Sequence, residues 1–180
     1  MTKDLLELET RSKIFDFIVQ YPGIHLRELE RALGMSAPLL DYHLRVLLRG
    51  GLVSVLEEEA YKRYYPEPSS VKDVRVLSPG EKRMLALLRQ EIPLSIVLYL
   101  LRMGNTRHGE IAAELGLRAS TLSYHLGKLV TGEIVEKTSV GKKRGYRLKD
   151  RDGTFKLLIA CRPLSKDMFD RFVEIWRELY

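Results

Sequence analysis

Cysteine is almost absent from this chain, whose 180 residues include a single one, Cys161. One cysteine allows no internal disulfide and no thiolate cluster, so the composition suits a reducing compartment and excludes a cysteine-based metal site. The four histidines form no pair with the spacing of metal ligands; they are His25, His43, His108 and His125. We therefore expect neither a metal nor another cofactor.

Long apolar runs are also missing. The longest one, IPLSIVLYLL at residues 92–101, is well short of the roughly 20 residues that a membrane-spanning helix needs. The N-terminal stretch MTKDLLELET lacks the apolar core of a secretory signal. From these two features we expect a cytoplasmic protein that does not associate with membranes.

The chain lacks the short motifs that accompany common catalytic sites. It contains no glycine-rich loop that would cradle a phosphate, no nucleophile elbow and no ligand-spaced histidine pair. We therefore predict that the protein is not an enzyme.

Basic charge is present, and it is unevenly distributed. The net charge is +6, from 30 Lys and Arg against 24 Asp and Glu. Residues 76–150 contain 13 basic and 7 acidic side chains, whereas residues 1–75 contain 11 and 12. This concentration favours a polyanionic partner for the middle of the chain.

An internal repeat organises the sequence. A shift of 82 residues aligns DYHLRVLLRG, residues 41–50, with SYHLGKLVTG, residues 123–132, without a gap. The same shift aligns the Leu-Gly pair at residues 33–34 with the pair at residues 115–116. A unit of this length is much longer than a solenoid repeat, so the pattern indicates two duplicated domains.

Each copy shows the same order of predicted elements. Apolar spacing predicts first helices at 11–20 and 93–103, second helices in HLRELERALG and RHGEIAAELG, and third helices at 36–49 and 119–130. Two short strands that flank a charged tip follow in each copy, as in a β-hairpin. The predicted fold is mainly α with small β-hairpin wings: tandem winged helix-turn-helix domains plus a C-terminal amphipathic helix.

Three segments are predicted from these elements. Residues 1–75 form the first domain, residues 76–150 a connector helix with the second domain, and residues 151–180 a C-terminal helical segment. We expect an apolar stripe in that segment to pair two chains as a homodimer; it consists of Met168, Phe169, Phe172, Ile175, Trp176 and Leu179. The alternative is that the stripe packs on the winged domains of its own chain.

Two segments carry a family resemblance. PGIHLRELERALGMSAPLLDYHLRVLLRGGLV and GEIAAELGLRASTLSYHLGKLVTGEIV resemble ArsR-type winged helix-turn-helix transcription regulators, and the duplication with a C-terminal helix resembles the archaeal tandem form. The resemblance implies binding of double-stranded DNA, with the third helix in the major groove and the wing on the backbone. Metal-sensing members use clusters of cysteine and histidine that this chain lacks, so metal sensing is not implied.

The repeated Tyr-His-Leu motif can be interpreted from helix geometry. At 100° per residue, with the preceding leucine facing the core, Tyr42 and Tyr124 point away from the core, where a phenol can bond to phosphate. His43 and His125 fall at the edge of the core. We expect these histidines to be hydrogen-bonded locally, and direct contact with DNA is the alternative.

We call the outward face of a third helix, together with its wing, a recognition surface. The surface of the second copy is rich in hydroxyls and cations, and its predicted DNA contacts are Arg118, Ser120, Thr121, Ser123, Tyr124, Lys128, Lys142, Lys143 and Arg144. The surface of the first copy is more acidic and apolar, with Leu39 and Asp41 on the helix and Glu57–Glu59 at the wing. Its predicted DNA contacts are Tyr42, Arg45, Lys62 and Arg63. We expect the second copy to carry most of the base recognition.

Two functions fit this pattern. A sequence-specific transcription regulator explains the paired domains and the basic second copy. A winged-helix assembly protein, similar to some chromosome-segregation subunits, explains the acidic first copy through protein contacts. Besides DNA, the expected partners are a second copy of the chain and, through the first domain, a protein of the transcription machinery. Salt-sensitive, sequence-selective DNA binding would separate the two functions.

Overall fold

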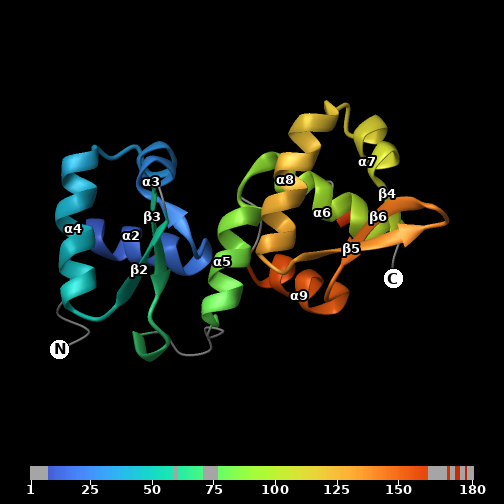
Figure 1. The fold of residues 1–180 in the computed structure, drawn as a ribbon. Coiled ribbons are helices and arrows are strands. Elements are labelled where there is room, and N and C mark those ends of the chain that lie inside the picture. The colour runs from blue at the N-terminus through green and yellow to red at the C-terminus, as the bar shows by residue number, and fades with distance from the viewer. Residues whose placement is uncertain are drawn as a thin grey trace. The chain divides into compact units, whose positions relative to one another are not determined.

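The computed structural model describes residues 8–58, 61–70, 77–161, 170, 173–174 and 177. The chain divides into two compact units, Met1–Ser78 and Pro79–Tyr180, which are described separately below (Figure 1). This division lies three residues beyond the boundary predicted from the sequence.

The first unit contains three α-helices and a three-stranded antiparallel sheet among its described residues. In chain order the elements are α2 (Glu9–Gln20), β1 (Ile24–His25), α3 (Leu26–Leu33), α4 (Ala37–Arg49), β2 (Val53–Glu58), β3 (Tyr61–Pro66) and the short 3-10 helix η1 (Pro68–Ser70). The strands lie in the order β1, β3, β2. Strands β2 and β3 form the wing.

Local signals explain the limits of α3. His25 and Glu28 form a capping box: the amide of Glu28 donates to Nδ1 of His25, and the amide of His25 donates to the Glu28 carboxylate. At the other end, Gly34 takes the left-handed conformation with φ of 64°, which glycine adopts without strain. Local interactions therefore define both ends of the helix.

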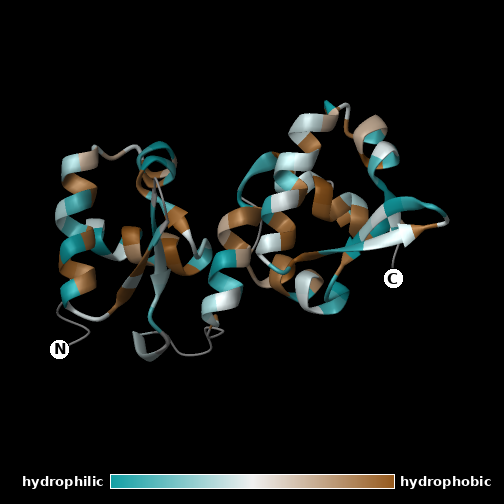
Figure 2. Cartoon of the chain, in the orientation of Figure 1, coloured by the Kyte–Doolittle hydropathy of each residue, from teal (hydrophilic) through white to brown (hydrophobic). Residues whose placement is uncertain are grey.

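The core of the first unit joins all of its main elements. It is built from Ile14 and Ile18 of α2, Ile24 of β1, Leu29 of α3, Leu40, Leu44 and Leu47 of α4, and Tyr64 of β3. The apolar sides of these elements appear as brown segments in Figure 2. Because the leucines of α4 recur at helical spacing, the opposite side of this helix is left to solvent.

The second unit repeats this arrangement and adds a helix at each end. Its described elements are α5 (Pro79–Leu88), α6 (Glu91–Met103), β4 (Thr106–Arg107), α7 (His108–Glu114), α8 (Ala119–Thr131), β5 (Val135–Val140), β6 (Lys143–Leu148) and α9 (Arg151–Cys161). The strands lie in the order β4, β6, β5, and β5 and β6 form the wing.

The sheet registers show the duplication directly. Ile24 lies opposite Tyr64 in the first sheet, and Thr106 lies opposite Tyr146 in the second, so both partners are displaced by 82 residues. The predicted fold of two winged helix-turn-helix domains is confirmed. The two-residue strands β1 and β4 were not predicted, because two residues are too short to show an alternating pattern.

Helix α9 belongs to the second unit. Phe155, Leu158 and Cys161 are buried, and α9 packs against α5. The Arg151 guanidinium donates to the carbonyl oxygen of Leu101, with Nη2 2.9 Å from the oxygen. The segment predicted to start at residue 151 therefore begins with a helix that completes this unit.

The described helices are short in comparison with a membrane-spanning helix. No single one of them is long and apolar enough to cross a membrane. Helices α5 and α6 reach the required length only when taken together, and they meet at a bend of 103°.

Candidate nucleic-acid interface

Helix α8 presents a polar outward face in the second unit. Leu122, Leu126 and Leu129 are fully buried, which fixes the rotation of the helix. The side opposite these leucines carries the predicted DNA contacts of the helix. Ser120, Ser123 and Tyr124 are exposed there, and Thr121 and Lys128 are half-buried. Arg118 is exposed at the N-cap of the helix.

The Tyr-His-Leu motif has the same geometry in both units. Tyr42 and Tyr124 are 59% and 60% exposed, so the predicted outward direction of both phenols is confirmed. Each tyrosine ring meets the following histidine ring edge to face, with centroids 5.1 Å apart. The motif therefore places a phenol on the surface and an imidazole beneath it.

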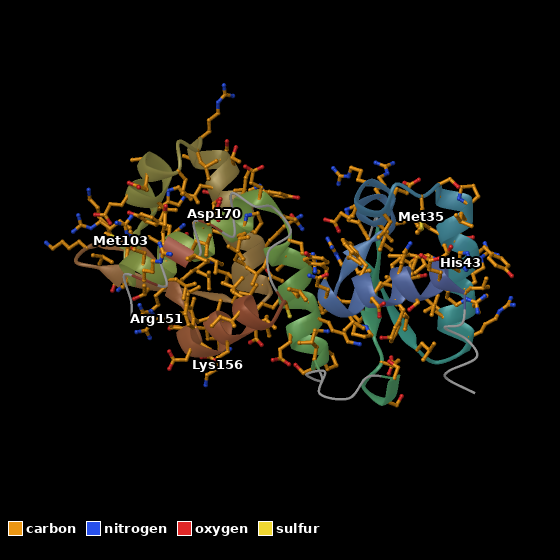
Figure 3. The ribbon with its side chains drawn as sticks, turned by 180° about the vertical axis from the view of Figure 1, so that it is seen from behind. Met35, His43, Met103, Arg151, Lys156 and Asp170 are labelled. Atoms are coloured by element: carbon orange, nitrogen blue, oxygen red, sulfur yellow. The ribbon has the colours of Figure 1, made fainter. Side chains whose placement is uncertain are left out.

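The two histidines lie in apolar surroundings that disfavour their charged form. His43 is only 6% exposed, and its place on α4 is marked in Figure 3. Burial, and after it the positive charge of Arg11, lowers the pKa of His43 below its ordinary value of 6.5. Burial and then Lys128 lower the pKa of His125 in the same direction. Within the described residues neither Nδ1 has a hydrogen-bond partner, so the predicted local bond is not found at that atom.

The wing of the second unit ends in three consecutive cations. Val140 pairs with Lys143 and Ser139 with Arg144, so Lys142 stands at the turn itself, next to Gly141 with φ of 63°. Lys142, Lys143 and Arg144 are all exposed. In the part of the chain that the structure describes, none of the three has a carboxylate within salt-bridge distance, so their charges are available to an external anion.

Lys128 and Tyr124 form a further pair on α8. The Lys128 Nζ lies 4.7 Å from the centre of the Tyr124 ring, within the range of a cation–π contact. This pair places a positive charge beside an exposed phenol on the outward face.

Two predicted cations of the first unit are already paired with carboxylates. The Arg45 guanidinium lies 2.7 Å from the Asp41 carboxylate on α4. On the wing, the Lys62 Nζ lies 3.0 Å from the Glu57 carboxylate, and the two residues face each other across β2 and β3. Both pairs are exposed, so each contributes little to stability. In each pair the carboxylate reduces the attraction that the cation offers to phosphate.

The prediction that Arg63 contacts DNA is wrong for this conformation. Arg63 is only 4% exposed, and its Nη1 donates to the carbonyl oxygen of Gly23 at 3.0 Å. The guanidinium therefore points toward the turn before β1 and not toward solvent. Arg63 therefore serves the fold of the first unit.

Apolar and aromatic side chains are exposed on the first recognition surface. Leu39 is 42% exposed, Tyr42 lies one turn further along, and Val55 on β2 is also exposed. The neutral ion pairs and these apolar groups give the first recognition surface a different chemistry from the second.

One contact in the second unit was not predicted. The Nε2 atom of His108 lies 3.0 Å from the Oγ of Ser123, which links the start of α7 to the outward face of α8. The alignment of the two copies could have indicated a special role for His108, because it places this polar residue opposite the apolar Leu26.

The predicted dimerisation stripe lies outside the part of the chain that the structure describes. Its residues are Met168, Phe169, Phe172, Ile175, Trp176 and Leu179. Among the residues that are described, no three His, Cys, Asp or Glu side chains gather as metal ligands would.

Family models match both units. Residues 8–77 match a model described as an N-terminal HTH domain, and residues 94–137 match the model of the bacterial regulatory proteins of the arsR family. The second match includes α6, α7, α8 and the start of β5. The matches agree with the tandem arrangement seen in the structure.

One similar protein is MJ1398 of Methanocaldococcus jannaschii, described as an uncharacterized HTH-type transcriptional regulator. The two sequences are 30% identical over 142 residues, which is 79% of this chain and 34% of that protein. The chain thus spans about a third of the length of this relative.

Two solved structures are also similar. Reduced HlyU from Vibrio cholerae shares 22% sequence identity, with a TM-score of 0.37, over 56% of this chain and 88% of that one. The DIP2311 protein from Corynebacterium diphtheriae shares 18% identity, with a TM-score of 0.30, over 77% and 26%.

Proposed function

Because the chain is an ArsR-like protein with two winged helix-turn-helix domains in tandem, we propose that it is a transcription regulator that binds specific sequences of double-stranded DNA. In this proposal α8 reads the major groove, and the wing formed by β5 and β6 holds the phosphate backbone. The helix-turn-helix family matches support DNA binding in general. The assignment of the major groove to α8 and of the phosphate backbone to the wing is argued from the geometry of the second unit.

The difference between the two wings is the observation that carries the proposal. Lys142, Lys143 and Arg144 are exposed with no carboxylate near them among the described residues, whereas Lys62 is paired with Glu57. A wing that contacts DNA needs cations that can replace condensed counterions on phosphates. Only the second wing has this property among the residues described.

The outward face of α8 supplies the groups that base recognition requires. Ser120, Thr121 and Ser123 can donate or accept hydrogen bonds at base edges, and Arg118 can reach guanine or phosphate. The buried leucines set the rotation of α8, which leaves Ser120 and Ser123 exposed and Thr121 half-buried at the edge of the outward face. Tyr124, with Lys128 beside its ring, is suited to the flanking backbone.

Selection of bound fragments from a random DNA pool tests this function. We expect a defined motif, with affinity that falls steeply as salt increases, because several phosphate contacts contribute. Weak retention without a preferred sequence would contradict the proposal and would favour the assembly function instead.

We further propose that the first recognition surface contacts a protein of the transcription machinery. Its two ion pairs neutralise Arg45 and Lys62, and Leu39 and Tyr42 offer apolar area of the kind found in protein interfaces. A photo-crosslinking amino acid at Leu39 tests this in the full chain with DNA and purified transcription machinery. Crosslinks to protein from Leu39, and to DNA from a matched probe at Thr121, are expected. Crosslinks to DNA from both positions would contradict this assignment.

A further inference from the structure

His108 and Ser123 are joined side chain to side chain in the second unit. The hydrogen bond runs from the first residue of α7 to the outward face of α8, with 3.0 Å between Nε2 and Oγ. Ser123 is exposed and directly precedes Tyr124 in the predicted DNA-contacting face. The Ser123 hydroxyl therefore has a protein partner of its own.

The His108 ring is itself held in place. It is half-buried, and its centroid lies 6.1 Å from the centroid of Tyr146, with the two rings tilted by 52°. Tyr146 is buried and pairs with Thr106 in the sheet. The core of the unit thus supports the imidazole that reaches Ser123.

The first unit shows that the fold does not require this contact. The equivalent residues there are Leu26 and Asp41. Leu26 packs against the apolar core, and Asp41 pairs with Arg45 on its own helix. The link between the second and third helices therefore belongs to the copy that carries the basic wing.

A serine hydroxyl without a fixed partner discriminates poorly between base pairs. It can rotate, and it has one donor hydrogen and two acceptor lone pairs. The hydrogen bond to His108 occupies one of these donor or acceptor positions and thereby fixes the direction of the others. We propose that His108 is a positioning residue, which aims the Ser123 hydroxyl at one base pair and thereby contributes to sequence preference. This inference rests on the proposed reading of DNA by α8.

Selection from a random DNA pool with four proteins tests the inference: the wild type, Ser123→Ala, His108→Leu and His108→Gln. The leucine variant copies the residue of the first unit, and the amide of glutamine can occupy the place of Nε2. We expect S123A and H108L to lose preference at the same base pair, by roughly 3- to 10-fold, as for loss of one hydrogen bond. H108Q should retain that preference, and all four proteins should keep the same salt dependence.

The double variant H108L/S123A gives a second readout. If His108 acts through Ser123, the double variant should discriminate between base pairs no worse than S123A alone. Additive losses of preference would overturn the inference. An H108L protein that keeps the preference lost by S123A would also overturn it, while leaving the proposed function intact. A wild type that selects no motif would overturn the proposed function and this inference with it. Thermal unfolding checks each variant, and H108A replaces H108L if leucine is not tolerated.

Discussion

Arg63 donates a hydrogen bond from Nη1 to the carbonyl oxygen of Gly23, 3.0 Å away, inside the first unit. The bond ties the middle of β3 to the turn before β1, where Gly23 has φ of +81° and its amide donates to the carbonyl of Tyr64. A charged donor that satisfies a buried carbonyl is among the stronger hydrogen bonds in a protein. The guanidinium therefore ties the central strand of the sheet to the turn that precedes β1.

Replacing Arg63 with alanine should destabilise the protein without changing how it binds DNA. We expect the free energy of unfolding to fall by about 1.5–3 kcal/mol, because the Gly23 carbonyl loses a charged partner. Chemical denaturation measures the loss. The matched control is Lys62→Ala on the same strand, which removes an exposed ion pair and should have little effect. An R63A protein of unchanged stability but weakened salt dependence would return Arg63 to the DNA-contacting set.

The triple variant K142A/K143A/R144A tests the second wing. We expect weaker binding to every DNA sequence alike, because these cations are proposed to neutralise phosphates and not to read bases. The slope of log affinity against log salt should flatten by roughly 2 to 3 units, at about 0.9 per contact. Lys62→Ala in the first wing should leave the slope unchanged. A triple variant with the wild-type slope would show that this wing does not touch the backbone.

Alanine substitutions on the two third helices test where base recognition lies. T121A/S123A on α8 should relax the selected motif, because hydroxyls that reach base edges are lost. L39A/D41A on α4 changes the aligned positions of the first copy and should alter the motif less. Comparison of the motifs selected by the two variants provides the measurement. A motif degraded equally by both, or mainly by the α4 changes, would reverse the assignment of the two surfaces.

The third helices could be predicted closely from the sequence. Their leucines recur at helical spacing, and the limits expected at 36–49 and 119–130 differ by one residue from α4 and α8. The outward direction of Tyr42 and Tyr124 follows from the same spacing. Local periodicity was sufficient in these cases because the core contacts of each helix repeat every turn.

Contacts between distant parts of the chain could not be predicted in this way. The burial of Arg63 depends on Gly23, 40 residues earlier, and on a strand of only two residues. The link from His108 to Ser123 joins two helices through a turn whose geometry the sequence does not specify. By contrast, the Asp41–Arg45 pair has the i, i+4 spacing of a helical ion pair and could have been recognised from the sequence.

Truncation after Pro163 tests the proposed homodimer. It removes the apolar stripe at residues 168–179 and keeps α9, whose buried residues complete the second unit. We expect a dimer of about twice 20.8 kDa to become a monomer that remains folded but loses cooperative DNA binding. Sedimentation velocity at tens of micromolar measures the change. A full-length monomer, or a truncated chain that unfolds, would contradict the proposal, and the second result would place the stripe within the core of its own chain.

The buried His43 should make the stability of the first unit depend on pH. Its pKa in the folded protein lies below the ordinary value of 6.5, so the unfolded chain binds a proton more readily than the folded one. The contribution of His43 should therefore be complete above about pH 6.5 and should be lost as the pH falls through the lowered folded pKa. Urea denaturation between pH 7.5 and 5 should show a decline that His43→Gln reduces, because glutamine does not titrate. The same decline in both proteins, or an NMR titration of His43 above pH 6.5, would contradict this prediction.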